Sequence, residues 1–219
     1  GVKMSKIIIF DMDGVLIDSE PVWQQVECEF YLRHYNISLG PKDFDLFTGM
    51  PVGIFLRKLH ENHGLPSNNL PQIQDTIVAQ VAEKIRQQPK PIAGIFELLN
   101  YLQRRGTLMA VASSSPQYQI DNVLNTLNIR HYFSAVVSAD GLSYGKPHPE
   151  IFLTAAAMLK AEPETCLVIE DSLNGVIAAR AAGMRVIALP AEHQQNDPRF
   201  TIADTVILNH CQVLEWLTA

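Results

Sequence analysis

Short apolar runs that end in polar residues recur along the chain. They show no alternation with polar residues, which is typical of strands buried on both faces of a sheet. Stretches with apolar residues at helical spacing lie between them and follow one another regularly from residue 94 onward. The predicted strands are Lys6–Phe10, Leu108–Ala112, Ala135–Val137, Leu167–Ile169, Arg185–Leu189 and a weaker Thr205–Leu208, and the helices between them are Gly94–Arg105, Pro116–Leu127, Pro149–Lys160 and Ser172–Ala182. This alternation predicts an α/β fold in which helices cover both faces of a parallel sheet.

Residues 15 to 90 interrupt the alternation and contain no convincing strand. Three segments there carry apolar residues on one helical face, namely Pro21–Tyr35, Val52–Asn62 and Leu70–Gln87. The block is entered through Asp18–Pro21 and left through the proline-rich Gln88–Pro91, and two short connections at one place suit a hinge. We therefore predict a catalytic α/β core formed by residues 1–17 and 91–219, with an inserted all-helical cap domain at residues 18–90.

Composition and charge narrow the class of protein. The chain has 219 residues, of which 47% are hydrophobic and 18% charged, which excludes a disordered chain or a small disulfide scaffold. Its net charge of −6 and the absence of a basic run predict no nucleic-acid or membrane partner. No apolar run has the length of a membrane-spanning helix. The cysteines are odd in number and far apart (Cys28, Cys166 and Cys211), so we expect reduced thiols in a cytoplasmic protein. We separately expect the protein to be a monomer. Gly1–Lys3, ahead of Met4, is interpreted as a cloning remnant.

Polar side chains that suit phosphate chemistry follow the predicted strands. Ligands bind outside the carboxyl ends of the strands in an open parallel sheet, so these residues should lie together. They are Asp11, Asp13, Ser113, Ser114, Ser115, Glu170 and Asp171, with Lys146 in a nearby loop. Clustered carboxylates repel one another unless a cation joins them, and an all-oxygen set suits Mg²⁺. A metal, a lysine and hydroxyl groups together predict an anionic substrate, and phosphate is the obvious one.

The segment Asp11-Met12-Asp13-Gly14 has a spacing that suits paired carboxylates. Residues i and i+2 of an extended chain point the same way, and Gly14 permits a sharp turn. One carboxylate can then attack while the other moves a proton. A strand-end turn with solvated acids would have the same sequence. A calcium loop is excluded because Val22 stands where the bidentate glutamate would be.

Four motifs in order resemble those of the haloacid dehalogenase superfamily. Phe10-Asp11-Met12-Asp13-Gly14-Val15-Leu16-Ile17-Asp18-Ser19-Glu20 is similar to the first motif. Val111-Ala112-Ser113, Gly145-Lys146-Pro147 and Ile169-Glu170-Asp171-Ser172 are similar to the second, third and fourth. The helical insert resembles the C1 cap of the β-phosphoglucomutase-like branch. The segments Gln195–Phe200 and Ile17–Pro21 look closest to those of bacterial hexitol or 2-deoxyglucose-6-phosphate phosphatases. The resemblance spans about residues 6 to 210 and implies a doubly wound, Rossmann-like sheet of order 3-2-1-4-5.

The resemblance also implies a role for each matching residue. Asp11 would be the nucleophile that forms an aspartyl-phosphate, and Asp13 the general acid and base. Phosphoryl oxygens would be held by Ser113, Ser114 and Lys146. Mg²⁺ would be bound by the carboxylates of Asp11 and Asp171 and the main-chain oxygen of Asp13, with Glu170 acting through water.

The expected function is Mg²⁺-dependent hydrolysis of small sugar or polyol phosphate monoesters. Superfamily dehalogenases lack an acid at position 13, so Asp13 favours a phosphatase or a phosphomutase. Mutases of this branch carry a histidine where Trp23 aligns and an arginine near Val52, and both are missing here. A β-phosphoglucomutase-type enzyme therefore stays the alternative, beside a non-catalytic binding protein of the same fold. The complete set of motif residues speaks against the latter.

Candidate substrate-binding residues in the cap are Glu20, Trp23, Gly49 and Met50. Trp23 either stacks on a sugar or packs between helices, Met50 either contacts substrate or fills a gap, and Glu20 either binds hydroxyls or favours a helix N-terminus. Pro51 stands where related phosphatases tend to carry a basic residue, which leaves the sugar undefined. Two further expectations concern packing: His60 and His63 are placed at the surface, and Ser115 is expected to cap the helix at Pro116.

Overall fold

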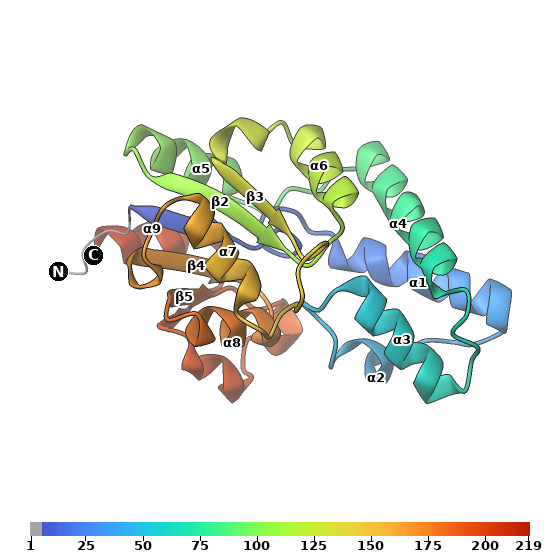
Figure 1. Cartoon of the computed structure of the whole chain (residues 1–219). Helices are drawn as coiled ribbons and strands as arrows, with labels where there is room; N and C mark the ends of the chain where they lie inside the picture. The colour runs from blue at the N-terminus through green and yellow to red at the C-terminus, as the bar shows by residue number, and fades with distance from the viewer. Residues whose placement is uncertain (1–5) are drawn as a thin grey trace.

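The computed structural model describes residues 6–219 and has a six-stranded sheet in which all neighbouring strands are parallel (Figure 1). The order is β3-β2-β1-β4-β5-β6, which confirms the predicted order and adds the weak sixth strand at the edge. Residues 1–5, with which the predicted core begins and which include Gly1–Lys3, lie outside the described residues. The strands are β1 (Ile7–Phe10), β2 (Leu108–Ser113), β3 (Ala135–Ser138), β4 (Cys166–Glu170), β5 (Arg185–Ala188) and β6 (Thr205–Val206).

Helices cover both faces of the sheet, which confirms the doubly wound architecture (Figure 1). One face carries α5 (Ile95–Arg104), α6 (Gln117–Thr126) and α9 (His210–Thr218), and the other carries α7 (Glu150–Met158) and α8 (Leu173–Ala181). Successive residues of β1 divide between the two apolar clusters: Ile8 and Phe10 join the first, and Ile9 joins the second. All three are fully buried, which explains why the strand sequence shows no polar alternation.

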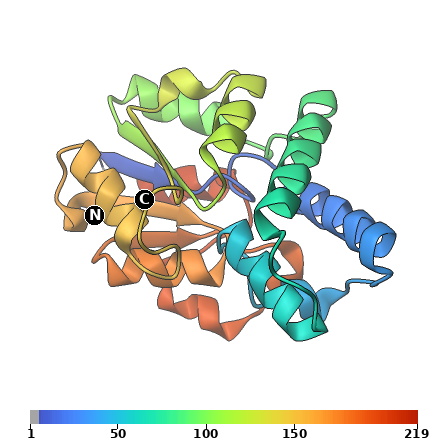
Figure 2. The same ribbon diagram turned by 45° about the vertical axis from the view of Figure 1, so that its right-hand side comes forward.

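Four helices stand between β1 and α5 in the chain and gather at one side of the sheet (Figures 1 and 2). They are α1 (Glu20–Tyr35), α2 (Pro41–Phe44), α3 (Val52–His63) and α4 (Leu70–Gln87). A proline in the first turn starts α1, and Asn36 ends it in the left-handed conformation with φ 54°. Gly64 ends α3 in the same way, with φ 65°. The helical insert predicted from the sequence is therefore present.

The two chain segments that join these helices to the sheet lie side by side. The Asp18 amide donates to the Lys90 carbonyl oxygen at 2.8 Å, and the Ile92 amide donates to the Leu16 carbonyl oxygen at 3.0 Å. Ile17 and Pro91 form an antiparallel bridge between these bonds. The entry and the exit of the insert thus form one short two-stranded connection, at the positions where the sequence places the hinge.

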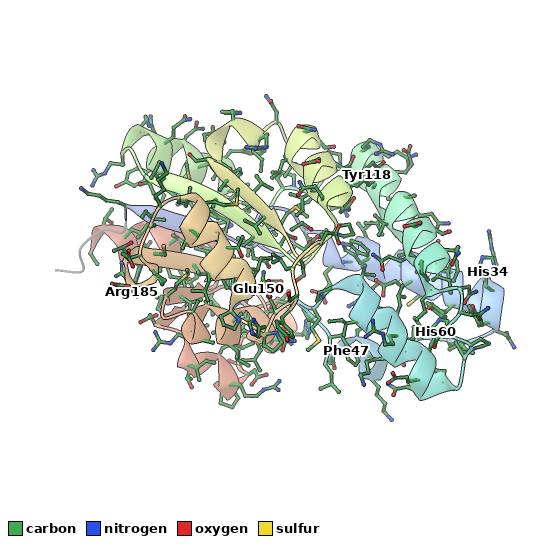
Figure 3. All side chains as sticks on the ribbon, viewed as in Figure 1. His34, Phe47, His60, Tyr118, Glu150 and Arg185 are labelled. Carbon is green, nitrogen blue, oxygen red and sulfur yellow. The ribbon has the colours of Figure 1, made fainter. Side chains whose placement is uncertain are left out.

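Three details differ from the sequence-based expectations. His60 was expected at the surface but is fully buried, because its ring bonds to Tyr31 Oη at 2.8 Å and to the Pro66 carbonyl oxygen at 2.7 Å (Figure 3). His63 is exposed, as expected. The short α2 and the C-terminal α9 were not predicted; α2 has only four residues, too few to show a helical repeat of apolar positions. None of the helices between residues 6 and 219 combines the length and the apolar character needed to cross a membrane.

Candidate active site

The carboxyl ends of β1, β2 and β4 bring the predicted motif residues together. Register pairs Phe10 with Val111 on one side and with Ile169 on the other, so Asp11 emerges between the ends of β2 and β4. The Asp11 amide continues the ladder by donating to the Ile169 carbonyl oxygen at 3.0 Å. This is the position at which open α/β sheets bind their ligands.

A buried lysine joins two of the carboxylates. The Nζ of Lys146 lies 3.0 Å from Asp11 Oδ1, 2.5 Å from Glu170 Oε1 and 3.0 Å from the Ala112 carbonyl oxygen. Burial acts to lower the pKa of Lys146, but the charges of Asp11 and Glu170 outweigh burial and raise it. The ammonium group is therefore kept charged at the floor of the site. An uncompensated charge would be costly to bury there.

Three carboxylates lie close enough to share a cation. One oxygen from each of Asp11, Glu170 and Asp171 lies within 4.8 Å of the others. Burial and the neighbouring charge of Asp11 raise the pKa of Glu170 to about 7, although Lys146 opposes this, and the same causes raise the pKa of Asp171. The protein alone thus leaves this cluster short of positive charge. The cluster fits a hard divalent cation, which prefers oxygen ligands.

Two glycines make room for this cluster. A Cβ at Gly14, whose φ is +83°, would lie 2.0 Å from Asp171 Oδ2. A Cβ at Gly175 would lie 1.9 Å from the carboxyl carbon of Glu170. Ser172 caps α8 by accepting a bond from the Gly175 amide at 3.0 Å, and its own amide and hydroxyl face Glu170 Oε2 at 3.3 Å. The fourth motif therefore sets the position of Glu170 through the start of α8.

Asp13 lies in a different environment from Asp11. Its carboxyl accepts bonds from Ser19 Oγ, from Ser115 Oγ at 2.8 Å and from Trp23 Nε1 at 3.3 Å. Burial raises the pKa of Asp13, the hydroxyl of Ser19 opposes this, and the charge of Asp11 adds to the rise. One aspartate is thus paired with a lysine, while the other has a raised pKa and is more readily protonated than an exposed aspartate. Such a divergence suits a nucleophile beside a general acid.

A cavity of about 130 Å³ opens above these groups, between the sheet and the inserted helices. Its floor is acidic and hydroxylic, one wall is the polar side of α1, and the opposite wall comes from α2, α3 and the segment between them, which contains Phe47 (Figure 3). Among the described residues that line it there is no lysine or arginine. The lining residues are Asp11, Asp13, Glu20, Trp23, Gln24, Glu27, Phe44, Phe47, Thr48, Gly49, Met50, Val52, Phe55, Ser114, Ser115 and Asp171.

All four candidate cap residues line this cavity. Glu20 and Trp23 come from the first turn of α1, and Gly49 and Met50 from the loop before α3. Trp23 lines the cavity and also packs against the apolar cluster, so part of its ring is used in helix packing. Its indole nitrogen bonds to Asp13, which ties this part of α1 directly to the catalytic floor.

The loop at residues 48–51 rests directly on the core. Ser114 Oγ donates to the Gly49 carbonyl oxygen at 2.7 Å, and Asn174 Nδ2 donates to the Thr48 carbonyl oxygen at 3.0 Å. Gly49 has a φ of +83°, and a Cβ there would lie 2.1 Å from Ser172 Oγ. The insert is therefore closed over the sheet, and backbone oxygens of the loop form the contact.

Two of the predicted phosphate-binding residues, Ser113 and Ser114, differ in their access to the cavity. Ser114 lines the cavity while its hydroxyl holds Gly49, whereas Ser113 is fully buried and accepts a bond from the Ser115 amide at 3.1 Å. The expectation for Ser115 was wrong. Pro116 occupies the cap position of α6, and the chain turns so that the hydroxyl of Ser115 reaches Asp13.

Sequence reasoning missed two polar residues of the site, Ser19 and Glu27, and gave Ser115 a different role. Ser19 stands within the first motif but carried no assigned role, and its hydroxyl bonds to Asp13. Glu27 was overlooked because it follows Val26, and only the apolar residues of this helix were considered in the prediction. The signal that was present is the polar repeat Glu20, Gln24 and Glu27, which places three polar side chains on one side of α1.

Comparison with known proteins gives three results. The family described as haloacid dehalogenase-like hydrolase matches residues 8–189. Hexitol phosphatase B of Escherichia coli K12 is 36% identical over 201 residues, which cover 90% of this chain and 88% of that protein. Fructose-1-phosphate phosphatase YqaB of the same organism is 30% identical over 191 residues, which cover 82% of this chain and 94% of that protein. The crystal structure of CbbY from Rhodobacter sphaeroides in complex with phosphate shares the fold, with a TM-score of 0.87 and 21% sequence identity. The match covers 99% of this chain and 100% of that chain.

Proposed function

Because the chain belongs to the haloacid dehalogenase-like hydrolase family and is a phosphoric monoester hydrolase, we propose that it cleaves small sugar or polyol phosphates through an aspartyl-phosphate. Membership confirms the resemblance carried by the four motifs. The observation that supports the mechanism best is the contrast between the two aspartates. Asp11 is paired with Lys146 at 3.0 Å, whereas burial raises the pKa of Asp13.

In the first step, a carboxylate oxygen of Asp11 forms a bond to phosphorus while the bond from phosphorus to the sugar oxygen breaks. Asp13 gives its proton to the departing sugar oxygen, so the leaving group is a neutral alcohol. In the second step, Asp13 takes a proton from water as the water oxygen attacks phosphorus. The bond from phosphorus to Asp11 then breaks, which releases phosphate and restores both residues. Ser113, Ser114 and Lys146 are proposed to hold the phosphoryl oxygens.

Mg²⁺ is the cofactor we propose for the acidic cluster. The carboxylates of Asp11 and Asp171 and the main-chain oxygen of Asp13 would hold it, with Glu170 acting through water. The raised pKa values of Glu170 and Asp171 support this, because the cluster gains from added positive charge. When bound, the ion neutralises charge so that an anionic carboxylate can approach a phosphate dianion.

The cavity supports a small, uncharged sugar or polyol as the part of the substrate beyond the phosphate. Its volume of about 130 Å³ is near that of an engineered cavity of about 150 Å³ that holds benzene, which indicates a small organic group rather than a macromolecule. No described lining residue is cationic, so a second phosphate group would find no neutralising partner. This disfavours a mutase that passes through a sugar bisphosphate. Two of the relatives are named for hexitol and fructose-1-phosphate hydrolysis, which agrees with such substrates.

We also propose that residues 18–90 act as a cap that closes on the core, that the enzyme works as a monomer, and that it is cytoplasmic. The paired connection at Ile17 and Pro91 supports the first, because it gives the insert one place to pivot. The three cysteines are free, which agrees with a reducing compartment.

The experiment that tests the proposed function is phosphate release from hexose and hexitol phosphates with Mg²⁺, compared between the wild type, Asp11→Asn and Asp18→Asn. Asp18 is exposed and lies in the same motif, so its variant controls for the loss of one carboxylate. We expect release by the wild type and by Asp18→Asn, and a loss of at least about 10³-fold in Asp11→Asn. Comparable turnover by Asp11→Asn would rule out Asp11 as the nucleophile.

A further inference from the structure

We propose that Glu27 determines substrate specificity by binding a hydroxyl group at the end of the substrate that lies away from the phosphate. The inference rests on the proposed function, since it concerns how the same cavity recognises a sugar or polyol. Glu27 lines the cavity, yet only 5% of its surface is exposed. Glutamate is among the residues least often buried without a partner, so its place there calls for an explanation.

The carboxyl group of Glu27 has no hydrogen-bond or ion-pair partner among the described residues. Its nearest charged influence is Glu20, two turns earlier on α1, which repels it. Burial and Glu20 raise the pKa of Glu27 to about 8, so the side chain is largely a neutral acid at neutral pH. Its carboxyl oxygens are not fully enclosed by protein, because Glu27 lines the cavity, and a ligand there can supply the hydrogen-bond partner that the protein does not.

The position of Glu27 along α1 fixes which part of a substrate it meets. Trp23 Nε1 bonds to Asp13 at 3.3 Å, so the first turn of α1 lies at the catalytic end. Glu27 follows four residues later, which is about 6 Å farther along the helix axis. A substrate whose phosphate lies at Asp11 therefore has to extend past Trp23 before it reaches Glu27.

The wall opposite α1 is aromatic. The Phe44 and Phe55 rings are stacked with centroids 5.6 Å apart, and Phe47 packs against Phe55 at 6.0 Å. A carbon chain with hydroxyl groups on one side matches both walls, because its C–H side can face the rings while its hydroxyls face α1. A neutral carboxyl can donate its proton to a hydroxyl oxygen and accept from a hydroxyl with its other oxygen. The site thus selects a longer polyhydroxylated chain over a short or aromatic one.

The test compares Glu27→Met, Glu27→Gln and the control Glu29→Gln, an exposed acid on the same helix. Substrates are a hexitol 6-phosphate, glycerol 3-phosphate and 4-nitrophenyl phosphate. We expect Glu27→Met to raise KM for the hexitol phosphate at least about tenfold, the loss typical of one hydrogen bond, while values for the other two substrates change less than about twofold. Glu27→Gln can still donate and accept, so it should stay near the wild type, as should Glu29→Gln.

Other outcomes overturn the proposal in distinguishable ways. An unchanged KM for the hexitol phosphate in Glu27→Met would show that Glu27 does not contact the substrate. Equal losses on all three substrates would show that the residue only shapes the cavity, and a Glu27→Gln variant as impaired as Glu27→Met would exclude hydrogen bonding as its role. If the wild type released phosphate from none of the substrates, the proposed function would fail first, and this inference with it.

Discussion

Replacing Glu27 by glutamine should change how the stability of the protein depends on pH. The folded protein holds the pKa of this carboxyl at about 8, through burial first and the charge of Glu20 second. In the unfolded chain the same group has its ordinary pKa of about 4.3. Between these two values the folded state keeps a proton that the unfolded state has lost, so the wild type loses stability as pH rises through this window.

The size of the effect follows from the linkage between proton binding and folding. The slope approaches about 1.4 kcal/mol per pH unit, and between pH 5 and pH 7 it lowers the unfolding free energy by about 2.5 kcal/mol. Glutamine has no proton to lose in this range and occupies nearly the same volume. The difference in unfolding free energy between Glu27→Gln and the wild type should therefore shift by about 2.5 kcal/mol in favour of the variant.

Urea unfolding at pH 4, 5, 6 and 7 measures this difference directly, because shared titrations of the two proteins cancel when they are subtracted. Glu29→Gln is the matched control, and its difference from the wild type should be nearly independent of pH, since Glu29 is exposed on the same helix. A difference for Glu27→Gln that stays constant between pH 5 and pH 7 would show that Glu27 is ionised in the folded protein. The electrostatic reasoning about the cavity would then be refuted.

Two further predictions concern the acidic cluster. Chelation with EDTA should abolish phosphate release and added Mg²⁺ should restore it, because the three clustered carboxylates of Asp11, Glu170 and Asp171 share the charge of one lysine, Lys146; turnover that persists without metal would contradict the proposed cofactor. Gly175→Ala should lose about 3 kcal/mol of unfolding free energy and most of its activity, because the added Cβ meets the Glu170 carboxyl and forces it away from Lys146. Gly53→Ala, where the added Cβ meets only the end of the Gln74 side chain at 3.1 Å, is the control, and equal stability of the two variants in a thermal melt would contradict the expected clash.

The sheet and most helices were predictable because they depend on local patterns. Strands such as β2 are buried on both faces over most of their length, so residues 109–112 are all apolar, and glycines or prolines mark many of the helix ends. The four motifs likewise predict that Asp11, Glu170 and Lys146 lie together, as they do in the structure.

The remaining features depend on partners that are distant in the sequence. The burial of His60 needs the hydroxyl of Tyr31, 29 residues away, and the bond from Ser115 to Asp13 spans 102 residues. No periodicity reports such pairings, because they follow from how helices and loops pack against one another. The burial of Glu27 could not be predicted from the sequence either. A glutamate on a helix is normally exposed, and this one is buried only because the assembled cavity surrounds it.

The bridge between Ile17 and Pro91 also bears on how such an enzyme changes over evolution. Because the chain leaves and re-enters the core at adjacent positions, the segment between them can lengthen, shorten or be exchanged while the strands keep their order and register. Selection for a new sugar can then act on α1 and the loop before α3 while Asp11, Asp13 and Lys146 stay fixed on the sheet. The residues proposed for the chemistry and those proposed for substrate choice can therefore change independently of each other, although one gene encodes both.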